Sequence, residues 1–294
     1  MLTTRFANRL GASATRRLGA TYTQARSLNV FSSERLVGKN VLVTGASSGI
    51  GASTAELFAK AGSNVVLLAR RRANLDAVKA KCEAAHAEGG YSGSKVVVIE
   101  ADMQDRKALD TVLDKTEGLK LDVLVNNAGL VRGREHVGVA AEADIDVMFN
   151  TNVIGLIQLT QNVVRDFKKR NTGLIVNLGS VAGIESYPGG SIYCATKFAV
   201  HAFTDSLRHE LIDTNVRIAE ILPGMVETEF SVVRYRGDQG RADNEYKGIT
   251  PLTGADVAEQ IVWVASRPEH VQVANLLMFP SQQSAATRNW RRPE

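Results

Sequence analysis

The chain has 294 residues, of which 44% are hydrophobic and 22% are charged. These values are typical of a globular protein built around one large domain. No apolar run of about 18 residues occurs, which argues against a membrane span. Cys82 and Cys194 form neither a disulfide framework nor a zinc-binding pattern, and the histidines do not cluster as metal ligands would. We therefore expect no bound metal.

The excess positive charge is concentrated at the amino terminus. Residues 1–35 carry six arginines and one glutamate, so residues 36–294 carry a net charge of −1, although the whole chain carries +4. A nucleic-acid partner would require a basic surface on the folded part, and we expect none. The first 33 residues contain no acidic side chain. They predict a mitochondrial transit peptide, and hence a matrix protein. The alternative is a disordered tail on a cytoplasmic protein.

From residue 39 onward, short apolar runs alternate with longer amphipathic stretches. This alternation predicts one α/β domain over residues 36–294, a doubly wound parallel sheet of seven strands with helices on both faces. No internal repeat or Pro/Gly-rich linker divides it. The predicted strands are NVLVTG (40–45), NVVLLA (64–69), KVVVIE (95–100), LDVLVN (121–126), GLIVNLGS (173–180), VRIAEIL (216–222) and NLLMF (275–279).

The first predicted strand runs directly into TGASSGIG at residues 44–51, and a helical pattern follows. Glycines permit a tight turn there, and the first N–H groups of the new helix can bind a pyrophosphate. A purely structural turn is the alternative, because the glycine spacing departs from G-x-G-x-x-G. The predicted phosphate contacts are Gly45, Ser47, Ser48, Gly49, Ile50 and Gly51.

Three arginines follow the second predicted strand. An NAD-dependent fold would carry an acidic side chain here for the ribose 2′-hydroxyl. The guanidinium groups of Arg70 and Arg71 instead match a 2′-phosphate in charge and geometry, with the Ser47 hydroxyl as a further contact. This pattern predicts NADP as the cofactor. We interpret Arg72 as the solvent-exposed start of the next helix.

The stretch SIYCATK at residues 191–197 places Tyr193 and Lys197 on one face of a predicted helix. Oxidation of an alcohol needs a base near the nicotinamide, and a neighbouring ammonium favours the ionised form of a phenol. We therefore predict Tyr193 as the base and Lys197 as the residue that lowers its pKa. Ser180 ends a predicted strand, where its hydroxyl can hold the substrate oxygen or simply cap a turn.

Five ordered motifs resemble the short-chain dehydrogenase/reductase family over residues 38–280: TGASSGIG, NNAG (126–129), NLGS (177–180), Tyr193-x-x-x-Lys197 and PG (223–224). SIYCATKFAVHAFTDSLRHEL and GMVETEFSVVRYRGD are further similar to its branch of NADP-dependent 3-hydroxy acid dehydrogenases, which oxidise serine and allo-threonine. The resemblance implies a Rossmann-type domain with strand order 3-2-1-4-5-6-7, oxidation of the 3-hydroxyl of a small hydroxy acid, and a homotetramer. The alternatives are a short-chain reductase of another small carbonyl compound, a non-catalytic NADP-binding assembly subunit and a methyltransferase.

The resemblance also implies roles for individual residues. Ser180, Tyr193 and Lys197 would be catalytic, and Lys197 would also bind the nicotinamide ribose. Asn152 would hold a water that links the lysine to solvent; its alternative is a buried amide that satisfies backbone groups. The further cofactor contacts would be Asp102, Asn127, Ala128, Gly129, Pro223, Gly224, Val226 and Thr228.

The long polar segment after Thr228 has little periodicity, which predicts a lid over the site. Because a 3-hydroxy acid carries a carboxylate, Arg234 or Arg236 in this segment could bind the substrate. We favour Arg234, which lies closer to Thr228. Cys194 follows the predicted base directly, and we expect it to pack rather than react.

Overall fold

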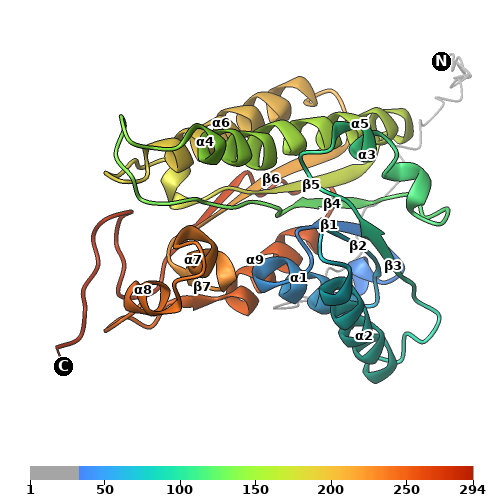
Figure 1. The fold of residues 1–294 in the computed structure, drawn as a ribbon. Coiled ribbons are helices and arrows are strands. Elements are labelled where there is room, and N and C mark those ends of the chain that lie inside the picture. The colour runs from blue at the N-terminus through green and yellow to red at the C-terminus, as the bar shows by residue number, and fades with distance from the viewer. Residues whose placement is uncertain (1–32, 294) are drawn as a thin grey trace, which may run out of the picture. The chain divides into compact units, whose positions relative to one another are not determined.

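A seven-stranded parallel sheet forms the centre of the protein (Figure 1). Its strands lie in the order β3-β2-β1-β4-β5-β6-β9, so the order reverses between β1 and β4. The description covers residues 33–293 and comes from a computed structural model. In those residues, no helix is both long and apolar enough to cross a lipid bilayer.

The strands of the sheet are β1 (Asn40–Thr44), β2 (Asn64–Ala69), β3 (Val96–Glu100), β4 (Val123–Asn126), β5 (Gly173–Leu178), β6 (Val216–Pro223) and β9 (Asn275–Met278). The helices are α1 (Gly49–Lys60), α2 (Arg72–Glu88), α3 (Arg106–Asp110), α4 (Glu142–Phe149), α5 (Leu156–Arg170), α6 (Ser191–Glu210), α7 (Glu229–Arg234), α8 (Gln239–Asn244) and α9 (Gly254–Ala265). Two short strands, β7 (Val226–Glu227) and β8 (Leu252–Thr253), pair with each other outside the main sheet.

The sheet has a separate hydrophobic core on each face. In β1, Val41 and Val43 pack into the core that contains Phe58 of α1, whereas Leu42 packs into the core that contains Phe167 of α5. Successive side chains of a strand point to opposite faces, so a strand covered on both sides must be apolar at nearly every position. This is why the strands appear in the sequence as continuous runs of Val, Leu and Ile.

The predicted seven-stranded α/β fold is confirmed, and each predicted strand boundary lies within two residues of the observed one. The implied strand order is also confirmed, with β9 as the seventh strand. The segment after Thr228, predicted as a lid with little periodicity, contains the short helices α7 and α8 and ends at β8. Elements of six residues or fewer are too short to show a period in the sequence. The predicted leader, residues 1–35, lies almost entirely outside the described residues.

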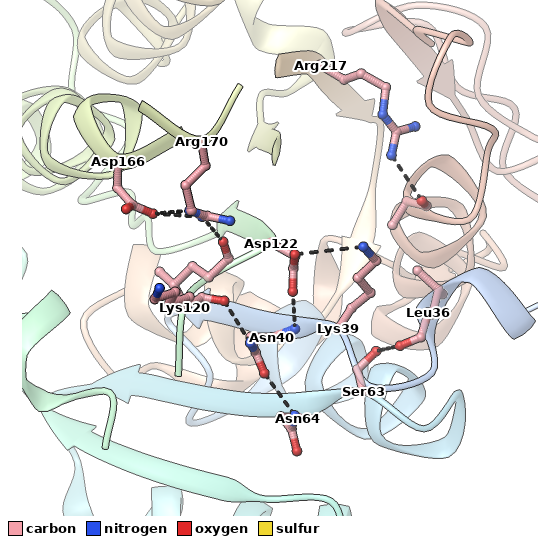
Figure 2. Close-up of polar contacts among 12 residues, drawn as sticks. Leu36, Lys39, Asn40, Ser63, Asn64, Lys120, Asp122, Asp166, Arg170 and Arg217 are labelled. Atoms are coloured by element: carbon pink, nitrogen blue, oxygen red, sulfur yellow. Dashed lines mark hydrogen bonds and ion pairs between the residues drawn. The ribbon is translucent and has the colours of Figure 1, made fainter. Parts of the chain in front are cut away.

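A row of polar side chains joins the amino ends of β1, β2 and β4 (Figure 2). Asn40, which begins β1, donates from Nδ2 to the Lys120 carbonyl at 2.7 Å, and its backbone N–H donates to Asp122 at 2.9 Å. Asn64, which begins β2, donates to Asn40 Oδ1 at 2.8 Å and accepts from the Lys95 N–H at 2.7 Å. These bonds satisfy backbone and amide groups that lie beyond the regular ladder of the sheet.

Replacing Asn40 with Ala should lower the free energy of unfolding by about 1–3 kcal/mol, because two side-chain hydrogen bonds are lost and one of the partners, Asn64, is partly buried. Urea denaturation measures this change. The matched control is Lys39→Ala, whose exposed ion pair with Asp122 is 3.8 Å long and should contribute less than about 1 kcal/mol. Equal unfolding midpoints for the two variants would contradict the role of Asn40.

Candidate active site

A cavity of about 330 Å³ opens at the carboxyl edge of the sheet. Open α/β sheets bind their ligands at this edge, next to the point where the strand order reverses. The sequence-predicted residues that line the cavity are Gly45, Ser47, Ser48, Gly49, Ile50, Arg70, Arg71, Asp102, Asn127, Ala128, Gly129, Ser180, Tyr193, Lys197, Pro223, Gly224, Val226 and Thr228. Gly51, Asn152 and Arg234 do not line it.

The loop between β1 and α1 packs closely against the segment that follows β4. Gly45 has a φ of +65°, and a Cβ there would lie 2.8 Å from Cα of Ala128. A Cβ on Gly51 would lie 2.4 Å from the Gly45 carbonyl oxygen. The Asn127 side chain donates to the Thr44 carbonyl at 2.8 Å. Gly51 therefore packs against the Gly45 backbone within the loop and does not line the cavity.

Helix α1 begins at the cavity wall. Its N-cap residue, Ser48, makes no side-chain bond to the helix and instead accepts from Arg71 Nη2 at 2.8 Å. The first N–H groups of a helix have no carbonyl partner within it, and the helix dipole places positive charge there. This end of the cavity therefore suits a phosphate group.

The two arginines after β2 reach the same end of the cavity. Arg71 Nη2 also lies 3.3 Å from Ser47 Oγ and 2.8 Å from a carboxylate oxygen of Glu229. Arg70 pairs with Asp102 at 3.6 Å. Arg72 instead forms an exposed pair with Asp76 at 2.9 Å, as expected for the start of a helix. Arg70 and Arg71 can thus present positive charge to an anion in the cavity.

Glu229 lines the cavity, although the sequence analysis did not identify it. It is the first residue of α7, and its bond to Arg71 lowers the pKa of its carboxyl group. The two residues are 158 positions apart in the chain. The sequence signal at Glu229 is only that of a helix start after Thr228, so its pairing with Arg71 depends on the tertiary fold.

Ser180, Tyr193 and Lys197 also line the cavity, and we call the surface that they form the catalytic wall. Tyr193 and Lys197 are buried on one face of α6, and Lys197 Nζ lies 5.9 Å from the centre of the Tyr193 ring. Lys197 donates to the Leu178 carbonyl at 2.8 Å, which ties α6 to the end of β5. Ser180 lines the cavity with Tyr193, and its side chain caps the next turn by accepting from the Ala182 N–H at 3.1 Å. The turn-capping interpretation of Ser180 is therefore confirmed, and its contact with a substrate oxygen stays a prediction.

Burial has the largest effect on the pKa values of Tyr193 and Lys197. It raises the pKa of the Tyr193 phenol, and the charge of Arg234 and the bond from Ser180 oppose that rise. Burial lowers the pKa of Lys197 to about 8, and the charge of Glu220 opposes that fall. Burial thus penalises the charged forms of both groups. That Lys197, together with the positive ring of a bound nicotinamide, favours the phenolate stays a prediction.

Asn152 lies behind the catalytic wall, in a π-helical turn between α4 and α5. Its Nδ2 donates to the Leu130 carbonyl at 2.8 Å, and its Oδ1 accepts from the Leu130 N–H at 2.8 Å. It also donates to Thr196 at 3.1 Å. Asn152 is thus a buried amide that satisfies the backbone groups of Leu130 and supports the segment after β4. Its role in holding a water that links Lys197 to solvent stays a prediction.

The two lid arginines occupy different environments. The Arg234 guanidinium lies 5.9 Å from the Tyr193 ring centre and donates to the Tyr187 hydroxyl at 3.2 Å. Arg236 points to the surface, where it pairs with Glu135 at 2.9 Å and Asp144 at 2.6 Å. The geometry therefore favours Arg234 as the arginine near the site. Cys194 is buried in the same small core as Tyr193, in agreement with a packing role.

Comparison with known proteins gives a consistent set of relatives. The chain matches the short chain dehydrogenase family over residues 39–238. It is 45% identical over 260 residues to an NADP-dependent 3-hydroxy acid dehydrogenase of Schizosaccharomyces pombe, which covers 88% of this chain and 98% of that protein. It is 39% identical over 246 residues to a serine 3-dehydrogenase of Agrobacterium fabrum, which covers 84% of this chain and 95% of that protein.

The same similarity extends to a solved structure. The closed form of a serine dehydrogenase complexed with NADP+ aligns with a TM-score of 0.79 at 38% identity, and the match covers 86% of this chain and 100% of that one. The family match spans more than half of the chain, and the relatives align over nearly their whole length. This chain therefore belongs to the short-chain dehydrogenase family.

Proposed function

We propose that this protein is an NADP-dependent dehydrogenase that oxidises the 3-hydroxyl of a small 3-hydroxy acid such as serine or allo-threonine. The observation that carries the proposal is the shape of one cavity, which has Ser180, Tyr193 and Lys197 on one wall and Arg70 and Arg71 at its far end. The relatives whose names include NADP support the cofactor, and those whose names include serine or 3-hydroxy acid support the substrate class.

The residues of the cavity fit NADP. The 2′-phosphate would lie against Arg71 and Arg70, whose guanidinium groups match a dianion, and the pyrophosphate would lie at the start of α1. The Lys197 ammonium would bind the nicotinamide ribose. Bound NADP+ would supply the hydride acceptor and the positive charge of its ring.

The chain's own residues would handle the proton. The substrate hydroxyl would sit between Ser180 and Tyr193, where Ser180 donates a hydrogen bond to the oxygen and Tyr193 takes its proton as the hydride leaves the carbon. Because burial raises the pKa of Tyr193, the phenolate needs nearby positive charge, which Lys197 and Arg234 provide. In the reverse direction the protonated phenol returns the proton to the carbonyl oxygen.

Arg234 is proposed to recognise the substrate carboxylate. Its Nε has no hydrogen-bond partner, and it is close to the ring of Tyr193. A buried guanidinium with a free donor can bind a carboxylate by a charge-assisted bond. This contact would select 3-hydroxy acids over uncharged alcohols.

A screen of NADP reduction tests the function. The purified protein is assayed with serine, the threonine stereoisomers, 3-hydroxybutyrate and simple secondary alcohols. We expect turnover with the hydroxy acids, and weaker activity with the methyl ester of serine, which lacks the carboxylate. Turnover of uncharged alcohols alone would favour the alternative of a general short-chain reductase. NADP binding without any turnover would favour an assembly subunit.

We also propose that the protein acts as a homotetramer in the mitochondrial matrix. The tetramer is supported by the family resemblance and by two large apolar side chains that are exposed, Phe198 at 42% on α6 and Leu277 at 46% on the edge strand β9. Sedimentation equilibrium of the purified protein measures the assembly state, and a monomer would exclude it.

Replacing Tyr193 with Phe should lower turnover by at least about a hundredfold, because the group that accepts the proton is removed while the ring remains. The dissociation constant for NADPH, measured by its fluorescence, should stay close to that of the original protein. Retained turnover would mean that the proton leaves by another group.

Replacing Arg71 with Ala should shift the cofactor preference from NADP toward NAD, because the 2′-phosphate loses charge-assisted bonds that contribute roughly 1.5–3 kcal/mol each. The measurement is the ratio of kcat/KM for the two cofactors. Arg72→Ala is the matched control and should leave the ratio unchanged, since Arg72 pairs with Asp76 away from the cavity. An equal response of the two variants would remove Arg71 from the cofactor site.

The amino-terminal segment should direct import into mitochondria. Fused to a fluorescent reporter, residues 1–33 should carry it into the matrix, because the inner-membrane potential draws positive charge inward. Replacement of Arg5, Arg9, Arg16 and Arg17 with Glu should abolish import. A reporter that remains in the cytosol with the original segment would refute this localisation.

A further inference from the structure

Two side chains of opposite charge are buried near the end of β5, one on the catalytic wall and one outside the cavity lining. Among the Asp, Glu, Lys and Arg residues that the structure describes, only Lys197 and Glu220 are buried, with exposed fractions of 5% and 0%. Burial of a charge is unfavourable unless it is paired or hydrogen-bonded. Lys197 has a proposed role in the site. Glu220 does not line the cavity, so the burial of its carboxylate needs another explanation.

Both groups contact the same short stretch of β5 and the residue that follows it. Lys197 Nζ donates to the Leu178 carbonyl at 2.8 Å. The Glu220 carboxylate packs against the next residue, Gly179, where a Cβ would lie only 2.3 Å from Glu220 Oε1. Glu220 lies on β6, opposite Asn177 of β5 in the sheet register. The absence of a side chain at Gly179 therefore gives the carboxylate its space beside the catalytic wall.

The helix that carries Lys197 also holds Glu220 in place. His201 Nδ1 lies 2.7 Å from Glu220 Oε2, and His201 Nε2 lies 3.8 Å from an Asp205 oxygen. Tyr193, Lys197, His201 and Asp205 recur every four residues along α6, so they form one stripe along the helix. His201 and Asp205 lie at its partly exposed end, which links the buried carboxylate to the surface.

One oxygen of Glu220 remains without a partner. Oε1 is fully buried and accepts no hydrogen bond from the protein. An unsatisfied buried carboxylate oxygen is destabilising, and a glutamine or an apolar side chain would avoid an ionised group there. The charge itself, rather than hydrogen bonding alone, is therefore the property that this position supplies.

We propose that Glu220 is a positioning residue for the reaction, whose buried negative charge keeps Lys197 in its ammonium form and directed toward the active-site wall. The role of Lys197 in binding the cofactor rests on the function proposed above. The charged or titratable groups that act on Glu220 are His201, Lys197 and Asp205, all on α6, and Glu220 is the charged group that acts on Lys197.

The sign of the effect follows from the burial of both groups. Burial lowers the pKa of Lys197 to about 8, and the negative charge of Glu220 raises it toward its ordinary value. Burial raises the pKa of Glu220, whereas the hydrogen bond from His201 lowers it and so favours the carboxylate. Removing the charge of Glu220 should therefore let Lys197 lose its proton at a lower pH.

The test is the pH dependence of NADPH binding, followed by cofactor fluorescence across the titration of Lys197. Affinity should fall as the ammonium loses its proton. In Glu220→Gln, which keeps the shape and removes the charge, the midpoint of this fall should move down by about one pH unit. In Glu220→Asp, which keeps the charge, it should lie closer to that of the original protein. Glu210→Gln, the same change at an exposed position of α6, should not move it.

His201→Phe provides a second variant if Glu220→Gln does not fold. This substitution, at a partly exposed position, removes the hydrogen bond from His201 to Glu220, so a smaller fraction of the carboxyl group should be ionised. The midpoint of NADPH binding should therefore move down, by less than in Glu220→Gln. The alkaline limb of kcat/KM for NADP reduction should follow the binding midpoint in each variant.

Two outcomes would distinguish a failure of the proposed role of Glu220 from a failure of the proposed dehydrogenase function. If the original protein binds NADPH and oxidises hydroxy acids, but the midpoint stays constant in Glu220→Gln or His201→Phe while thermal stability falls, Glu220 has only a structural role and the proposal is overturned. If the original protein does not bind NADPH, the proposed function fails first.

Discussion

The hydrogen bond from Lys197 to the Leu178 carbonyl is the contact on which the catalytic wall depends. It joins α6, the helix that carries the phenol and the ammonium, to the end of β5, the strand that leads into Ser180. A buried ammonium needs strong acceptors, because its transfer from water is otherwise costly. The bond therefore satisfies the lysine and sets the distance between the helix and the sheet edge at the same time.

The interior of the protein contains few charged groups. The position of those few charges affects the protonation of the residues in the active site. Both faces of the sheet are covered by helices, so the buried side chains are apolar or uncharged polar at nearly every described position. Lys197 and Glu220 interrupt them at one place, next to the glycine that follows β5. In such surroundings each charge acts strongly on its neighbour, because few solvent dipoles screen it. A small number of side chains can thus control the protonation of the catalytic wall.

The lid connects the two ends of the cavity. Helix α7 begins at Glu229, which pairs with Arg71 at the phosphate end, and ends at Arg234, which lies beside Tyr193 at the catalytic end. One short helix therefore contacts both the proposed cofactor-specificity residue and the proposed base. Movement of α7 would change both environments together, as expected for a segment that closes over a substrate.

The sequence by itself was sufficient to predict the sheet, the glycine loop, the paired arginines and the residues of the catalytic wall. Each of these depends on a local signal: an apolar run between turns, glycines at a strand-to-helix junction, or two side chains one helical turn apart. It could not predict the pairing of Arg71 with Glu229 or the burial of Glu220. Those contacts join residues 19 to 158 positions apart. A polar residue in a strand does not by itself indicate which side chain it will contact in the folded protein. Nor could it show that burial, rather than the neighbouring ammonium, has the largest effect on the Tyr193 phenol, since desolvation depends on every element that surrounds the ring.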